Sequence, residues 1–121
     1  MEVGFFTMPI HPIDKDYKKT LSEDREAFLL ADKIGFSEAY CGEHVTDAAE
    51  NITSSALFIA SLAAETKNIR LGTGTVNMPN SHPAAIAGQI AMLDHMLDGR
   101  FNFGISPGGL ASDAEAFGNL D

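Results

Sequence analysis

Short apolar segments recur along this chain, separated by longer amphipathic ones. Apolar runs without helical spacing occupy Val3–Thr7, Phe36–Gly42, Ile69–Val76 and Phe101–Ile105. Runs of about 4–8 apolar residues that are bounded by glycine, proline or polar residues are typical of strands in the interior of a sheet. The pattern therefore predicts four strands.

Between these runs, apolar residues recur every three or four positions, which is the spacing of a helix with one buried face. This spacing predicts helices over about 21–34, 53–66 and 83–97. Thr20 followed by Glu23 has the spacing of a capping box, which places the start of the first helix at Leu21. The predicted order is therefore strand, helix, strand, helix, strand, helix, strand.

Alternating strands and helices with short connections are typical of an α/β fold with a parallel sheet and right-handed crossovers. The chain has 121 residues, enough for one domain with its own core, and it shows no internal repeat or low-complexity stretch. We therefore expect a single α/β domain over residues 1–121.

Charge and cysteine content exclude several classes of protein. Eight Lys and Arg against 17 Asp and Glu give a net charge of −9, which argues against binding to nucleic acid or to an anionic membrane. The single cysteine, Cys41, cannot form an internal disulfide and suits a reducing compartment. No apolar run reaches the ~18 residues of a membrane span, and the start lacks a charged n-region. We therefore expect a cytoplasmic protein.

Residues with chemical potential gather after the predicted strands. In parallel α/β folds the carboxyl ends of the strands meet at one edge, where ligands bind. His44, beside Glu43, is the best candidate, because an imidazole next to a carboxylate exchanges protons near neutral pH. The alternative is a loop histidine that only hydrogen-bonds the backbone. No other histidine has metal-ligand spacing with His44, so we expect no metal site.

Two glycine-containing segments have a structural and a functional interpretation, and the sequence alone does not choose between them. The segment Gly72–Gly74 lacks the third glycine of a dinucleotide fingerprint. It indicates either a strand crowded by a neighbour or a bare backbone surface for a flat ligand. The segment Ser106–Gly109 is either an amide cradle for an anion or a plain turn.

Together, several short motifs resemble the N-terminal part of the bacterial-luciferase-like flavin monooxygenase superfamily. Each motif is weak alone, but their order and spacing follow this family over essentially the whole chain. Two of them, Gly42–Val45 and Gly104–Gly109, are most similar to the limonene-monooxygenase-like branch. The motifs are Gly35–Phe36, Glu43–His44, Gly72–Thr75 through Pro79, His82–Pro83, and Asp94 leading to Gly99–Ile105.

The resemblance implies a TIM-type (β/α)₈ barrel that binds reduced FMN, with O2 and a small organic substrate as co-reactants. A partner flavin reductase supplies the reduced flavin in this family. A deazaflavin is the alternative cofactor, since related reductases and dehydrogenases use one.

The resemblance also implies roles for individual residues. His44 matches an active-site acid or base, and Gly74–Thr75 matches a non-proline cis peptide bond against the flavin ring. Phe6 matches a residue of the ring pocket, and Asn77 lies near the same strand end. Ser106 occupies the position of a cysteine near the flavin in luciferase.

One position departs from the family pattern. Pro107 stands where luciferase has an arginine that binds the flavin phosphate. Proline has neither charge nor amide hydrogen, so this phosphate contact is absent. The amides of Gly108 and Gly109 are possible substitutes, and further phosphate ligands would come from later strands.

The length does not suffice for a whole barrel of this type. A (β/α)₈ barrel needs about 250 residues, whereas four strands and three helices make roughly half of one. The first and fourth strands would have unpaired edges, which tend to pair with other chains. We therefore expect either a piece of a longer enzyme or a half-barrel that forms homo-oligomers. A non-catalytic or flavin-binding module is the alternative function for the chain as it stands.

Overall fold

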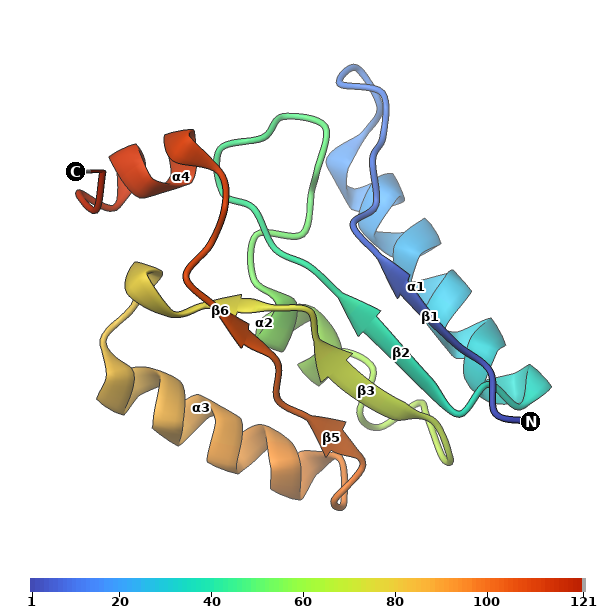
Figure 1. Ribbon diagram of the computed structural model, residues 1–121. Helices are drawn as coiled ribbons and strands as arrows, with labels where there is room; N and C mark the ends of the chain where they lie inside the picture. The colour runs from blue at the N-terminus through green and yellow to red at the C-terminus, as the bar shows by residue number, and fades with distance from the viewer. Residues whose placement is uncertain (121) are drawn as a thin grey trace.

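The computed structural model describes residues 1–120 and has the expected α/β architecture. Strands and helices alternate along the chain as far as the third strand (Figure 1). The strands are β1 (Gly4–Thr7), β2 (Glu38–Cys41), β3 (Arg70–Thr73), β4 (Val76–Asn77), β5 (Phe101–Asn102) and β6 (Ile105–Ser106). The helices are α1 (Tyr17–Ile34), α2 (Ser55–Ala60), the 3-10 helix η1 (Met78–Asn80), α3 (Pro83–Met96) and α4 (Ala111–Ala116).

All the ladders between these strands are parallel. The main sheet has the order β1-β2-β3-β5, and β4 and β6 pair beyond the ends of β3 and β5. Sequential strands are therefore neighbours, which is the topology of a (β/α) barrel segment. β1 and β5 are the outer strands of the main sheet within the described residues (Figure 1).

One apolar core lies between the main sheet and its helices. Alternate residues of β2 and β3 point into it, among them Ala39, Cys41 and Leu71, which are fully buried. Helices α1, α2 and α3 all contribute to the same cluster, so they cover one face of the sheet. The intervening residues lie on the opposite face, where the Tyr40 hydroxyl donates to Glu38 and accepts from Asn102.

The third and fourth predicted strands are each divided in the structure, so the prediction of two continuous strands was wrong. Between β3 and β4 lies the Gly74–Thr75 peptide bond, which is cis, as the resemblance implies. The Thr73 hydroxyl donates to the carbonyl of Gly104 (2.8 Å) and accepts from its amide (2.9 Å). A side chain thus replaces the backbone ladder at this point, and the two strands separate into β3–β4 and β5–β6.

The helix boundaries also differ from the prediction. α1 begins at Tyr17 because the Asp16 carboxylate caps it by accepting from the amide of Lys19 (3.0 Å). Thr20 lies buried within the helix, so the capping box at this residue was wrong. α2 ends at Ala60, about one and a half turns before the predicted end, and irregular turns follow.

The last helix, α4, was not predicted, because a six-residue helix carries too little apolar periodicity to be detected. Across residues 1–120, no helix combines the length and the apolar character that crossing a membrane requires.

Candidate functional site

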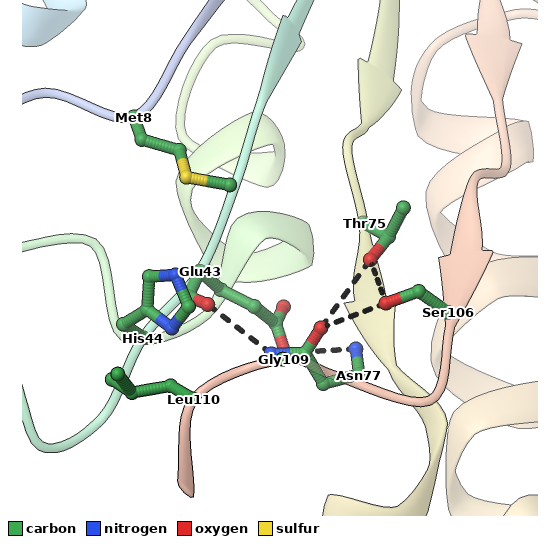
Figure 2. Close-up of a pocket in the computed structure, with 8 residues that line it drawn as sticks. All are labelled: Met8, Glu43, His44, Thr75, Asn77, Ser106, Gly109 and Leu110. Carbon is green, nitrogen blue, oxygen red and sulfur yellow. Dashed lines mark hydrogen bonds between the residues drawn. The ribbon is translucent and has the colours of Figure 1, made fainter. Parts of the chain in front are cut away.

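A pocket of ≈ 320 Å³ opens where the strands end and the loops after them converge (Figure 2). This is the edge at which parallel α/β folds bind ligands, and the volume falls within the range of small-molecule sites, about 300–1,000 Å³. Its walls come from the segments after β1 and β2, from β4 and from β6 with the following loop. The lining residues are Met8, Glu43, His44, Thr75, Asn77, Ser106, Gly109 and Leu110.

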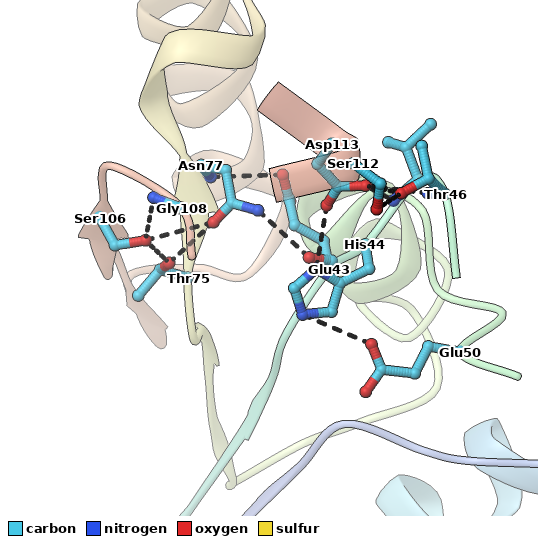
Figure 3. Close-up of polar contacts among 11 residues, drawn as sticks. Glu43, His44, Thr46, Glu50, Thr75, Asn77, Ser106, Gly108, Ser112 and Asp113 are labelled. Atoms are coloured by element: carbon cyan, nitrogen blue, oxygen red, sulfur yellow. Dashed lines mark hydrogen bonds and ion pairs between the residues drawn. The ribbon is translucent and has the colours of Figure 1, made fainter. Parts of the chain in front are cut away.

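His44 is held between two carboxylates that come from different elements (Figure 3). Its Nδ1 lies 2.9 Å from Oδ2 of Asp113, and its Nε2 lies 3.4 Å from Oε2 of Glu50. The side chains of His44, Asp113 and Glu50 retain exposures of 16%, 5% and 15%. The imidazole is thus oriented and largely shielded from solvent, yet it still reaches the pocket.

Asp113 joins α4 to the loop after β2. Its Oδ1 accepts from the amides of Val45 (3.1 Å) and Thr46 (2.9 Å) and from the Thr46 hydroxyl (2.7 Å). Burial alone would raise the pKa of the Asp113 carboxyl, but the hydrogen bonds from Thr46, His44 and Val45 outweigh it and lower the pKa below its ordinary value. Asp113 is therefore an ionised acceptor at neutral pH.

Glu43, the sequence neighbour of His44, has a different role from the one its position suggests. Its carboxylate accepts from the amide (3.0 Å) and hydroxyl (2.7 Å) of Ser55, at the start of α2. Its other oxygen accepts from the amide of Asn77 (3.3 Å), and its carbonyl accepts from the Asn77 side chain (3.2 Å). Glu43 therefore ties α2 to β4 and is not the carboxylate partner of His44.

Thr75, Asn77 and Ser106 form a polar cluster on the wall opposite His44 (Figures 2 and 3). The hydroxyls of Thr75 and Ser106 lie 2.5 Å apart and share a hydrogen bond, and the two oxygens lie 3.3 and 3.2 Å from Oδ1 of Asn77. The amide of Gly108 donates to the Ser106 hydroxyl (3.1 Å), so it is already engaged. The sequence placed these three pocket residues correctly at the ends of the third and fourth strands.

Phe6 and Gly74 are adjacent to each other, but they do not line the pocket. The ring of Phe6 is 56% exposed and covers Gly74, where a Cβ would lie 2.9 Å from Phe6 Cε2. At Gly72 a Cβ would lie 2.3 Å from the Tyr40 ring, so the crowded-strand interpretation is correct at that position. The proposed contact of Phe6 and Gly74 with a flavin ring stays a prediction.

Sequence reasoning missed four residues of this site: Met8, Glu50, Leu110 and Asp113. Asp113 is separated from His44 by 69 positions, and it lies on the helix that was not predicted. No local pattern pairs such distant residues. The one available signal was that Asp113 is an acidic residue in the segment after the fourth strand, where site residues are expected.

The charge around the pocket bears on which ligands fit. No Lys or Arg lines it, and Pro107 lies in the adjoining loop. Within residues 1–120 no group of histidine, cysteine and carboxylate side chains is placed to hold a metal ion. The described walls thus supply hydroxyl, amide, imidazole and apolar groups, together with the carboxylate of Glu43.

A parallel sheet whose sequential strands are neighbours, with its helices on one face and a pocket at the strand ends, has the arrangement of a (β/α) barrel segment. Comparison with family models matches the luciferase-like monooxygenases over residues 1–121. The chain belongs to the luciferase-like monooxygenase family.

Individual relatives are similar to this chain over most of its length. Limonene 1,2-monooxygenase of Rhodococcus erythropolis is 37% identical over 98% of this chain. The oxygenase component of a flavin-dependent trigonelline monooxygenase from Acinetobacter baylyi is 37% identical over 84% of it. These matches cover 30% and 29% of the relatives, so the chain spans under a third of their length.

Solved structures agree with the fold. The oxygenating constituent of 3,6-diketocamphane monooxygenase from Pseudomonas putida, solved with FMN, superposes with a TM-score of 0.93. It is 30% identical, with 98% of this chain and 32% of that chain covered. A coenzyme F420-dependent reductase from Methanopyrus kandleri superposes with a TM-score of 0.71 at 26% identity, with 97% and 30% covered.

Proposed function

We propose that the protein is a flavin-dependent monooxygenase in which reduced FMN and O2 oxygenate a small organic substrate. This chain would supply part of the active site. The observation that carries the proposal is the pocket at the strand ends, where His44 faces the cluster of Thr75, Asn77 and Ser106. Family membership supports the same activity.

The residues of the pocket suit the ring system of FMN. Flavin rings carry carbonyl oxygens and ring nitrogens, which pair with hydroxyl and amide groups such as those of Thr75, Ser106 and Asn77. Met8 and Leu110 supply apolar contact area beside them. When bound, reduced flavin supplies the activation of O2, and the protein supplies binding, orientation and electrostatics.

The phosphate of FMN requires groups beyond this pocket. The lining has no Lys or Arg, and the Gly108 amide is already bonded to Ser106. We therefore infer that other residues of the protein hold the phosphate, which agrees with proline at position 107.

His44 is the residue that we assign to proton transfer. Its ring reaches the pocket, and the contact of Nδ1 with Asp113 fixes the orientation of the imidazole. An oriented imidazole transfers protons to or from a bound ligand, which contributes about 10²–10⁴ to such rates.

The names of the relatives support proposals for the partner and the cofactor. One relative is named as an oxygenase component, and such a name implies a second component. We propose that the second component for this protein is a flavin reductase. A deazaflavin is the second cofactor candidate, because one superposed structure is a coenzyme F420-dependent reductase.

Titration with flavin tests the proposal. We expect reduced FMN to bind and to support oxygenation when a reductase and NADH are supplied. Ser106→Ala removes a pocket hydroxyl and should weaken binding about fivefold, the equivalent of about 1 kcal/mol for one hydrogen bond. Ser22→Ala, exposed on α1, is the matched control and should bind as the unaltered protein does.

A non-catalytic module that self-associates is the alternative function, favoured by the two outer strands of the main sheet. Binding of FMN without turnover would support this module for the 121-residue chain. Failure to bind either FMN or a deazaflavin would contradict the assignment of the pocket.

A further inference from the structure

The side-chain amide of Asn77 has a fixed orientation at the polar wall of the pocket. Its Nδ2 lies 3.2 Å from the backbone carbonyl of Glu43, and a carbonyl oxygen only accepts hydrogen bonds. The NH2 group therefore faces Glu43, and Oδ1 faces the hydroxyls of Thr75 and Ser106 (Figure 3). Asn77 is buried, and a buried acceptor without a donor is costly. One of the two hydroxyls therefore donates to Oδ1.

The hydroxyl hydrogens of Thr75 and Ser106 are both used within this cluster. The two oxygens lie 2.5 Å apart, so one hydroxyl donates to the other, and the second donates to Asn77. Ser106 also accepts from the amide of Gly108 (3.1 Å). If Thr75 donates to Ser106, Thr75 keeps both lone pairs free, and if Ser106 donates to Thr75, each hydroxyl keeps one. Thr75 thus has a free lone pair in both arrangements, and neither arrangement leaves a hydrogen for a ligand.

The hydroxyls of this wall therefore accept hydrogen bonds from a ligand and donate none. The edges of a flavin ring differ in what they present to such a wall. N3–H lies between two carbonyl groups, which need donors, whereas N5 has a carbonyl on one side and a C–H on the other. N5 carries only a lone pair in the oxidised ring and gains a hydrogen when the ring is reduced. In a deazaflavin, carbon replaces N5, so the reduced ring has no N–H at this position.

We propose that Thr75 is a specificity-determining residue that accepts a hydrogen bond from N5–H of reduced FMN and thereby selects FMN over a deazaflavin. This role rests on the flavin-dependent function proposed above, and it decides between the two cofactor candidates. Thr75 is partly exposed and lines the 320 Å³ pocket, so its free lone pair is accessible to a bound ring. Glu43 and Asn77 are positioning residues, because together they engage the hydroxyl hydrogens and leave the lone pairs to the ligand.

Anaerobic titration with reduced FMN and with reduced 5-deaza-FMN tests this role. The two ligands differ at ring position 5, so the ratio of their affinities reports on that position. We expect the unaltered protein to bind reduced FMN about fivefold more tightly, the effect of one hydrogen bond. In Thr75→Val, which keeps the shape of the side chain but lacks the hydroxyl, this ratio should fall to about one.

Two further variants are controls for this titration. Thr75→Ser keeps the hydroxyl oxygen and should retain the preference for reduced FMN. Thr53→Val makes the same change as Thr75→Val at an exposed residue outside the pocket, and it should leave both affinities unchanged.

Two results would overturn the proposal: equal or reversed affinities for the two reduced ligands in the unaltered protein, or a preference for reduced FMN that Thr75→Val leaves intact. The first comparison needs no variant, so it decides the matter if Thr75→Val does not fold. A protein that binds both ligands equally would keep the proposed flavin-dependent function and lose only this role. Failure to bind either ligand would contradict the assignment of the pocket to a flavin, and the role of Thr75 with it.

Discussion

At the scale of single residues, the site depends on pairs of side chains that are far apart in the sequence. His44 was identifiable from its place after a predicted strand, and Glu43 beside it suggested a local acid–base pair. The structure assigns the partner role to Asp113 and Glu50 instead, because the Glu43 carboxylate points toward Ser55 and Asn77. The two neighbouring side chains thus have different partners, so proximity in the sequence did not predict contact.

Asp113 gives a testable dependence of stability on pH. Its pKa is lowered in the folded state, so its stabilisation is present above the unfolded value of about 3.9 and is lost as pH falls through the folded value. We expect the free energy of unfolding in urea to fall below about pH 4. In Asp113→Asn the decrease in the free energy of unfolding at low pH should be smaller. In Asp94→Asn, a change at an exposed residue of α3, the decrease should be the same as in the unaltered protein.

Asp113→Ala should also destabilise the fold at neutral pH. The amides of Val45 and Thr46 would lose their acceptor, and each unsatisfied donor costs about 1–3 kcal/mol where it is buried. An Ala variant as stable as the unaltered protein would contradict the place of Asp113 as the anchor of this loop.

At the scale of elements, the third and fourth predicted strands are each divided into two shorter strands. The apolar runs were located correctly, but their continuity depended on a contact between strands. Thr73 and Gly104 lie on neighbouring strands, and their side chain-to-backbone bonds end the ladder between them. The pattern of apolar residues describes one segment at a time, so it does not predict a break that depends on a contact between two strands.

Gly104 is expected to be indispensable for that arrangement. A Cβ there would lie 2.1 Å from the carbonyl oxygen of Thr73, so Gly104→Ala should lower the free energy of unfolding by about 1–3 kcal/mol or more. Gly88 in α3 has no atom within 4 Å of an added Cβ, and Gly88→Ala should raise stability by about 0.5–1 kcal/mol. Equal effects of the two substitutions in urea unfolding would contradict the close approach at Gly104.

At the scale of the whole molecule, the chain has one compact core but leaves apolar surface uncovered. Phe6 on β1 and Ile105 on β6 are 56% and 57% exposed, and the main sheet ends at β1 and β5. Exposed apolar side chains and free strand edges both favour association. The net charge of −9 opposes it through repulsion between copies.

We therefore expect the 121-residue chain to self-associate, and to do so more strongly at high salt, where repulsion is screened. Size-exclusion chromatography with light scattering at low and high ionic strength measures this directly. A single monomer peak at both ionic strengths, together with cooperative unfolding, would contradict the expectation.

The sequence by itself determined the α/β class, the order of strands and helices and the family, and it placed His44, Thr75, Asn77 and Ser106 at the ends of the strands. Periodicity and local motifs carry this information, because secondary structure and the edge at which parallel strands end are properties of short segments. The tertiary structure decided what surrounds His44. Asp113 and Glu50 approach it only because chain folding brings α4 and the segment before α2 to the end of β2, and long-range contacts of this kind leave no local pattern.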